Sequence, residues 1–476
     1  MKLLFIGKVR ELSHQAIDEV LKKQTEKSMK KNQLKLAVAG AVFAAASAAH
    51  AGIIIPAGDW TLDIGGNVNS FATWSKQETA NVVKGGLTNI ANTNVSGKTN
   101  SNITTGLLPN FLSVGGTTRQ NDLDVSFVIS IQPGSSTTGA VGVQEGGINN
   151  RQAFLTFGDK SWGSIKVGKD LGIFAADAIL SDMTLLGVGA PTSAGNNTTL
   201  GRIGAGYLYA DWKAQIAYTT PNFNGFQATA GLTQNWGAAR SGTGEKVAAS
   251  TAITSSTGAL GASVTVSGIT ITSTTTAATY YSAASSARSS QTAYEGKASY
   301  SFAANDVTGK VWVSGIANRV NDLGAGVTVE DNVAYAGDIG ANVNAAGFGL
   351  TGYYYSGRGI GTTGQMWDGY ATNGKSRDSD GGYVQATYAL PTKTKVGVSW
   401  GISKLDLASG ESSAIATTAL SSGALVKQNE MWTGGIYHPL TKHLNIVAEY
   451  SHLQSENHAG QENKNKTGSL GAILFF

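Results

Sequence analysis

Apolar residues alternate with polar or small residues along most of the chain from Asp59 onward, in segments of about ten residues. In segment 395–403, Val398 and Trp400 hold one set of alternate positions, and Ser399 and Ser403 hold the other. A period of two places successive side chains on opposite faces of a β-strand. The pattern predicts strands with one apolar and one polar face, near residues 122–131, 212–220, 225–236, 292–303, 307–318, 331–344, 346–357, 380–390, 395–403, 428–438 and 443–453.

The last ten residues, TGSLGAILFF, follow the same pattern. Leu470, Leu474 and Phe476 share one face, and Ser469 and Ile473 share the other. Chain ends are usually frayed and hydrated, so an apolar end indicates a strand that faces an apolar environment. We expect this last strand to pair with the first one.

Two kinds of linker alternate between the predicted strands. Short turns occupy residues 221–225, 303–306, 344–347, 390–394 and 438–443. Long polar stretches occupy residues 76–106, 133–148, 171–201, 237–291, 358–379 and 407–427. Short turns at one end and long loops at the other are typical of outer-membrane barrels. The sequence therefore predicts an all-β protein, a transmembrane antiparallel β-barrel of about sixteen strands.

A closed barrel satisfies backbone hydrogen bonds where lipid offers no partner, because a closed sheet has no edge. A soluble β-sandwich or β-helix is the alternative, but it would need polar outer faces where this chain has Val, Trp, Tyr and Leu. Aromatic residues near strand ends are expected at the two membrane interfaces. The candidates for this girdle are Trp60, Trp74, Trp236, Trp312, Tyr354, Trp400 and Tyr437.

Charged residues make up only 14% of the chain, and there is no cysteine. The absence of cysteine excludes disulfides and thiolate metal sites. The net charge of +4 comes from residues 1–51, which hold nine Lys/Arg and four Asp/Glu; the remainder has 26 basic and 27 acidic residues. This balance does not suggest a nucleic-acid partner.

Residues 29–51 have the three parts of a secretory signal peptide, with a basic start, an apolar run and small residues before Gly52. Residues 1–28 precede this signal and read as a charged amphipathic helix, so we expect them to be a non-native upstream extension. The predicted barrel domain is 52–476. A membrane anchor is the alternative for 29–51, but its apolar run is too short to span the roughly 30 Å hydrocarbon core.

Sequence motifs typical of enzymes have little support in this chain. GIGTTG at 359–364 matches a dinucleotide-binding pattern but enters a polar loop, and 62 glycines make a chance match expected. The late histidines lack metal-ligand spacing. No nucleophile elbow stands at a strand-to-helix turn. We expect no catalytic residue, metal or cofactor.

Two stretches and the chain end together resemble the general porins of Gram-negative bacteria. They are RQAFLTFGDKSWGSIKVGKDLGIFAADAILSDMTLL at 151–186, GRIGAGYLYADWKAQIAYTTPNFNGFQATAGL at 201–232, and the terminal Phe476. The resemblance implies a homotrimer of sixteen-stranded barrels in the outer-membrane lipid. It implies a third loop that folds into the lumen, and a Phe476 that the barrel-assembly machinery reads.

The resemblance also implies a constriction where loop acids face wall bases. Arg151 and Arg202 match wall arginines of the family, and Asp182 matches a loop acid, with Asp177 as a partial substitute for a second one. The family has further bases near Phe111 and Asn67, which this chain lacks. Strand alternation adds Lys166 to the lumen, because it shares a face with Ser164 and Gly168. These five charges predict weak selectivity that leans slightly to anions.

Three functions remain open at this stage. The first is a porin for passive diffusion of small hydrophilic solutes and ions. The second is a substrate-selective channel of the same fold for organic or aromatic acids, which the apolar stretch LLGVGAP and the sparse charges favour. The third is a structural or adhesive outer-membrane protein that uses the Ser/Thr/Ala/Gly-rich segment 237–291, although a solvated shield is the simpler interpretation of that segment.

Overall fold

The structure is a computed structural model of the chain. It describes residues 52–78, 81, 83–89, 99–135, 148–193, 198–235, 291–323, 329–415 and 422–476, and the backbone of 251–254, 263–266 and 269–275. The predicted extension 1–28 and the whole predicted signal peptide 29–51 therefore lie outside the described residues, as does most of segment 237–291.

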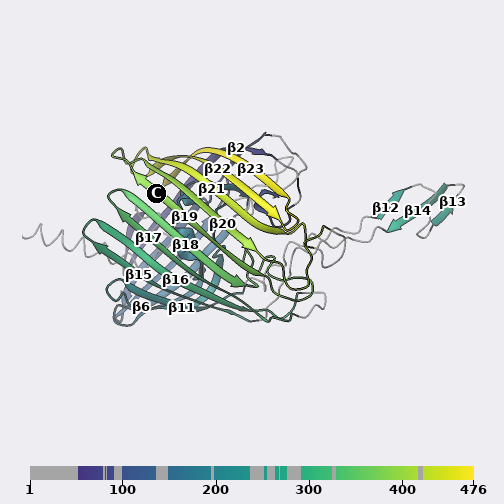
Figure 1. The fold of residues 1–476 in the computed structure, drawn as a ribbon. Helices are drawn as coiled ribbons and strands as arrows, with labels where there is room; N and C mark the ends of the chain where they lie inside the picture. The colour runs from purple at the N-terminus through teal and green to yellow at the C-terminus, as the bar shows by residue number, and fades with distance from the viewer. Residues whose placement is uncertain are drawn as a thin grey trace, which may run out of the picture. The chain divides into compact units, whose positions relative to one another are not determined.

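An 18-stranded antiparallel sheet forms the main body of the protein. β1 (Ile53–Ala57) and β3 (Thr99–Thr104) are short, and the other sixteen strands form the barrel. Those strands are β2 (Trp60–Gln77), β4 (Phe111–Gln120), β5 (Leu123–Gln132), β6 (Asn149–Asp159), β7 (Gly163–Leu171), β10 (Trp212–Thr219), β11 (Phe226–Thr233), β15 (Ala293–Ala304), β16 (Val307–Arg319), β17 (Val333–Ala345), β18 (Phe348–Arg358), β19 (Asp378–Ala389), β20 (Lys395–Leu405), β21 (Val426–Pro439), β22 (Leu444–Asn457) and β23 (Glu462–Phe475). Figure 1 shows β15 to β23 running side by side around the wall. The predicted barrel is confirmed, and the predicted strand ends are close to the observed ones.

The barrel closes between its last strand and its first. β23 pairs with β2 from Asn67↔Phe475 to Gln77↔Asn465. The terminal Phe476 exchanges two backbone hydrogen bonds with Gly66, at 2.8 and 3.0 Å. β1 pairs with the start of β2, on the edge that β23 covers only from Asn67 onward. β3 pairs with the end of β2, on the edge that β4 covers only up to Asn67. Closure removes the sheet edge, as the apolar chain end predicts.

Side chains of the wall alternate between an exposed outer face and a covered inner face. On β20, Val398 is 56% exposed, whereas Ser399 is 1% exposed. The outer face is thus apolar and the inner face is polar, the reverse of a soluble barrel and the arrangement that lipid requires. Among the described residues, no helix has the length and apolar character needed to cross a membrane.

Tight hairpins join the strands at one end of the barrel. Asn121 and Asp122, with φ of 47° and 63°, form the turn between β4 and β5, and both residue types tolerate positive φ. Connections at the other end are long, at 78–110, 133–148, 172–211, 234–292, 320–332, 359–377 and 406–425. The predicted alternation holds except at the last connection, where only 458–461 separate β22 from β23.

The aromatic girdle includes only some of the predicted residues. Trp74, Tyr354 and Trp400 lie on the outer face and are 41–51% exposed. Trp312 and Tyr437 are only 3% exposed and occupy inward positions of β16 and β21, so their assignment to the girdle was wrong. An aromatic residue can lie on either face of the wall. Its face is set by its place in the alternation of side chains along the strand. Trp236 lies outside the described residues.

Smaller elements lie between the barrel strands. The third loop holds α3 (Ala176–Leu180), the 3-10 helix η3 (Met183–Leu186), β8 (Ala190–Ser193) and β9 (Thr199–Gly201). A second 3-10 helix, η2 (Leu87–Asn89), follows β2. Within segment 237–291, β12 (Thr251–Thr254), β13 (Ser263–Val266) and β14 (Ile269–Thr275) pair as a separate three-stranded sheet.

Candidate channel constriction

The loop between β7 and β10 packs against the inner face of the barrel. Its side chains are covered along most of the loop, and Phe174, Ala178 and Val188 have no exposed surface or almost none. This burial explains why its sequence, AADAILSDMTLLGVGAP, is so apolar for a linker. The loop is therefore a fixed part of the channel interior, and the predicted inward fold is observed.

Carboxylates of the wall hold the backbone of this loop at two places. Glu295 of β15 accepts hydrogen bonds from the amides of Ile173 and Phe174, both at 2.8 Å. Glu449 of β22 accepts from the amides of Val188 and Gly189, at 2.7 and 2.9 Å. Each carboxyl group accepts two backbone amides that would otherwise lack a partner, so these two residues position the loop.

The middle of the loop is held by an amide side chain. Gln385 of β19 accepts from the amide of Met183 at 2.7 Å and donates to the carbonyl of Ser181 at 3.0 Å. Tyr383, two residues earlier on the same inner face, donates to the carbonyl of Ala178 at 2.8 Å. Wall strands β15, β19 and β22 thus each contact a successive part of the loop.

Asp177, in the first turn of α3, lies against two lysines of the wall. Lys297 of β15 is 3.1 Å from its Oδ2, and Lys310 of β16 contacts its Oδ1. Burial acts to raise the pKa of Asp177, but the two ammonium groups outweigh it, so that pKa lies below the ordinary value. Asp177 is therefore an ionised loop acid facing wall bases, and the sequence did not identify these bases.

Asp182 and Arg202 lie together in a fully covered place. The Nε of Arg202 is 3.8 Å from Oδ1 of Asp182, and neither side chain has exposed surface. Asp182 also caps η3 by accepting from Thr184, and it accepts from the hydroxyl of Tyr207 at 2.8 Å. Burial, followed by the charge of Asp182, raises the pKa of Tyr207 well above its ordinary value. This pair links two parts of the same loop rather than facing across open water.

Lys166 lies on the inner face of β7, as alternation predicts. It is in register with Ala217, which is 3% exposed, and it forms an ion pair with the buried Asp170. Its Nζ also lies 4.8 Å from the ring centroid of Phe154. Gln152 of β6 donates to the other carboxylate oxygen of Asp170 at 3.0 Å.

Arg151 lies elsewhere on the wall. Its neighbour Gln152 points inward, and its guanidinium lies 5.9 Å from the ring centroid of Trp212. Trp212 alternates with the exposed Ala214 and Ile216 on the outer face of β10. The β5–β6 register shifts between Ser130 and Ile131, next to this position. This placement differs from the expectation of a pore-facing arginine, since the guanidinium of Arg151 lies beside Trp212 at the ends of β6 and β10.

A second inward segment, residues 105–110 between β3 and β4, meets the third loop. The amide of Leu107 donates to the carbonyl of Gly187 at 2.8 Å, and the amide of Thr199 donates to Gly106 at 3.1 Å. Asn67 and Asn69 of β2 hold this segment through the carbonyls of Pro109 and Leu108. The family's base near Asn67 is thus replaced by an amide that fixes backbone.

Five inward-facing charged residues that contact the third loop or its partners were not identified from the sequence. They are Lys213, Lys297, Lys310, Glu295 and Glu449, and each occupies an inward position of an alternating strand. Lys213 forms an ion pair with Glu295, and both side chains are covered. The signal in the sequence that could have identified them is a charged residue on the polar face of a predicted membrane strand. Among the described residues, no group of three His, Asp or Glu side chains is arranged to hold a metal.

Comparisons with known proteins agree with this architecture. The sequence model of the Gram-negative porins matches residues 36–361. No curated protein sequence matches the chain.

Solved structures with the same fold are distant in sequence. The outer membrane channel DcaP of Acinetobacter baumannii has a TM-score of 0.57 and 14% identity, and the match covers 88% of this chain and 99% of that one. An anion-selective porin from Comamonas acidovorans has a TM-score of 0.51 and 13% identity, covering 88% and 100%. OmpF of Salmonella typhi, in complex with daunomycin, has a TM-score of 0.50 and 14% identity, covering 89% and 100%. With the family match over most of the chain and a sixteen-stranded barrel, the chain belongs to the Gram-negative porins and forms a β-barrel channel in the cell outer membrane.

Proposed function

We propose that the channel is a water-filled pore for passive diffusion of small hydrophilic solutes and ions, with weak selectivity. The observation that carries this proposal is the pairing of charges around the third loop. Lys166 pairs with Asp170, Lys213 with Glu295, and Arg202 with Asp182, while Asp177 pairs with two lysines. Paired charges leave a weak net field, so they discriminate little between anions and cations.

Two further properties stay proposals. We propose that the chain assembles as a homotrimer and that its Phe476 is read by the barrel-assembly machinery, as the resemblance to general porins implies. The hydrogen bonds of Phe476 to Gly66 support a structural role for this residue in barrel closure as well.

The test is planar-bilayer conductance of the refolded chain from Gly52 onward. We expect unitary conductance that rises in proportion to KCl concentration, and a reversal potential near zero in a KCl gradient with a small lean to anions. Arg151→Ala serves as a control on the wall and should leave the reversal potential unchanged. Strong cation preference would refute the proposed charge balance, and a missing conductance would refute the channel itself.

A substrate-selective channel for organic or aromatic acids is the second candidate. Arg202 Nε and Nη2 have no hydrogen-bond partner among the described residues, although Arg202 is fully covered. Tyr207 packs against Tyr353 and Tyr383 beside it, with ring centroids 6.5 and 5.7 Å away. An arginine beside tyrosine rings suits an aromatic carboxylate. Block of the ion current by benzoate at low concentration, lost in Arg202→Ala, would favour this candidate over simple diffusion.

A further inference from the structure

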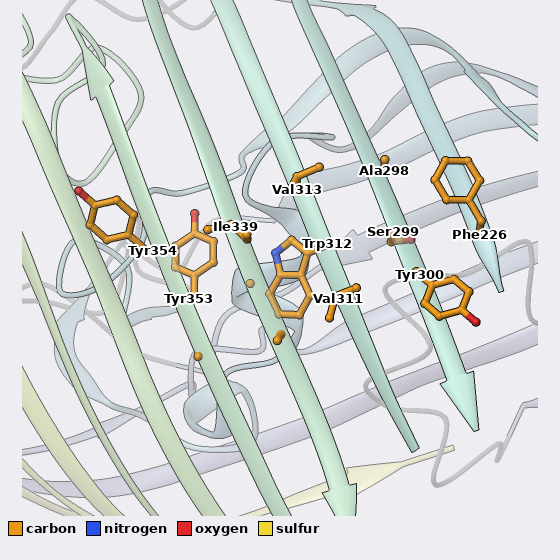
Figure 2. A pocket seen from close by; sticks show the side chains of 13 residues that line it. Phe226, Ala298, Ser299, Tyr300, Val311, Trp312, Val313, Ile339, Tyr353 and Tyr354 are labelled. Atoms are coloured by element: carbon orange, nitrogen blue, oxygen red, sulfur yellow. The ribbon is translucent and has the colours of Figure 1, made fainter. Parts of the chain in front are cut away.

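A groove of about 540 Å³ lies along the outer wall over β11 and β15 to β18. Figure 2 shows side chains around it, with Tyr300 and Phe226 at one end and Tyr354 at the other. Phe226 begins β11 beside the short turn 221–225, and its paired residue Tyr300 lies four residues before the end of β15, so the groove lies nearer the short-turn end of the barrel. Its walls also include Val313 and Ile339, which are 48% and 58% exposed.

The floor of the groove is formed by two residues that have almost no side chain. Ala341 and Gly352 are paired neighbours on β17 and β18, and both lie on the outer face. The same row continues to Val384, Trp400 and Trp432, which are 41–57% exposed. In this row the outer face is thus bulky beyond the groove and bare at the floor of the groove.

Nothing within the chain requires a glycine at 352. A Cβ at this position would meet no atom within 4 Å. A glycine inside a strand costs roughly 0.5–1 kcal/mol relative to alanine, and it often marks the close approach of a ligand. Gly352 therefore leaves the floor of the groove open, and no atom of the chain fills that space.

We infer that the groove binds one acyl chain of a phospholipid from the periplasmic leaflet of the outer membrane. The barrel belongs to the outer membrane, so hydrocarbon is the medium around this wall. The lining is apolar and aromatic, as an acyl chain requires. The lining residues of β15 to β18 lie in two neighbouring rungs across these strands, a few residues from the short turns. The short turns of such barrels lie at the periplasmic end, so the groove lies in the periplasmic half of the wall. Tyr300 is placed to meet the lipid near its head group, where aromatic side chains prefer to lie.

Filling the groove tests this inference. Full-length refolded protein would be titrated in detergent with dioleoyl phosphatidylethanolamine, and bound lipid would be counted by native mass spectrometry. We expect a retained lipid per chain in the wild type, with about tenfold weaker binding in Gly352→Leu because the new side chain displaces roughly two methylene groups. The substitution faces open space, so the barrel should fold normally.

Gly434→Leu is the matched control. Gly434 lies on the outer face of β21, and a Cβ there would also meet no atom within 4 Å. It should retain the lipid, and both variants should keep wild-type conductance, which separates this inference from the proposed channel function. Equal lipid loss in both variants, or no loss in Gly352→Leu, would overturn the inference. A change of oligomeric state in Gly352→Leu would also overturn it, because the groove would then be a contact between subunits.

Discussion

At the scale of single residues, the constriction depends on which charges are neutralised. Asp177 is the clearest case, because its carboxylate forms ion pairs with two lysines at once. Arg202 and Asp182, which look like opposed pore charges in the sequence, are covered and paired with each other. Under the proposed function, the residues that set selectivity are those with exposed charge. Lys310 is the most exposed of the five paired cations Lys166, Arg202, Lys213, Lys297 and Lys310, with 36% of its side chain accessible.

Replacing Asp177 with asparagine should release the field of Lys297 and Lys310 into the lumen. A unit charge a few Å away contributes on the order of 0.5–1 kcal/mol in water, so the anion-to-cation permeability ratio should rise about two- to fivefold. Reversal potentials in a KCl gradient measure this ratio. Asp306→Asn makes the same change of charge in an exposed short turn, and it should leave the ratio unchanged. An equal shift in both variants would show that overall charge, not the constriction, sets selectivity.

At the scale of elements, two long loops are joined by a buried ion pair. Arg377, at the end of loop 359–377, donates from Nε to Oε2 of Glu411 at 2.8 Å, and their side chains are 0% and 1% exposed. Ser422 and the amide of Ala408 donate to the same carboxylate. Burial acts to raise the pKa of Glu411, but the hydrogen bonds and charge of Arg377 outweigh it, and the pKa lies below the ordinary value.

A carboxyl whose pKa is lowered by folding stabilises the folded loops above its unfolded pKa, and this contribution disappears as pH falls through the folded pKa. Hydrogen exchange of 406–415 should therefore be slow at pH 7 and faster at pH 3, after correction for intrinsic rates. Glu411→Gln should lose about 3–5 kcal/mol of local protection at pH 7, because it leaves Arg377 covered without its partner.

Glu456→Gln provides the comparison for this loop prediction. It removes the partner of Lys427, whose side chain is 49% exposed, so the loss should be about 0–1 kcal/mol. Protection of 406–415 that does not change with pH would contradict the assigned role of Glu411.

At the scale of the whole molecule, stability depends on an apolar outer surface. Val384, midway along β19, is 57% exposed on that surface. Arginine at this position should cost about 2–4 kcal/mol in lipid vesicles, measured by denaturant unfolding. Asn342→Arg, on the inner face of β17, should cost less than about 1 kcal/mol because its charge remains in water. Similar costs for the two variants would mean that the outer wall is not in contact with lipid.

The barrel itself follows from local properties of the sequence. The period of two fixes which side chains share a face, and the turn residues fix where strands end, so both could be predicted without knowing any partner. The apolar end of the chain indicated closure, and β23 does pair with β2. Lys166 was placed on the inner face for the same local reason.

The constriction was decided by tertiary structure. Asp177 contacts two lysines that are 120 and 133 residues away in sequence. Asp182 accepts a hydrogen bond from Tyr207 within one folded loop. The local sequence pattern does not predict such pairs. Trp312 and Arg151 differ from expectation because the parity and register of neighbouring strands, rather than residue type, set their direction. Alternation gives a side chain its face, but its partner depends on how strands and loops distant in sequence are brought together.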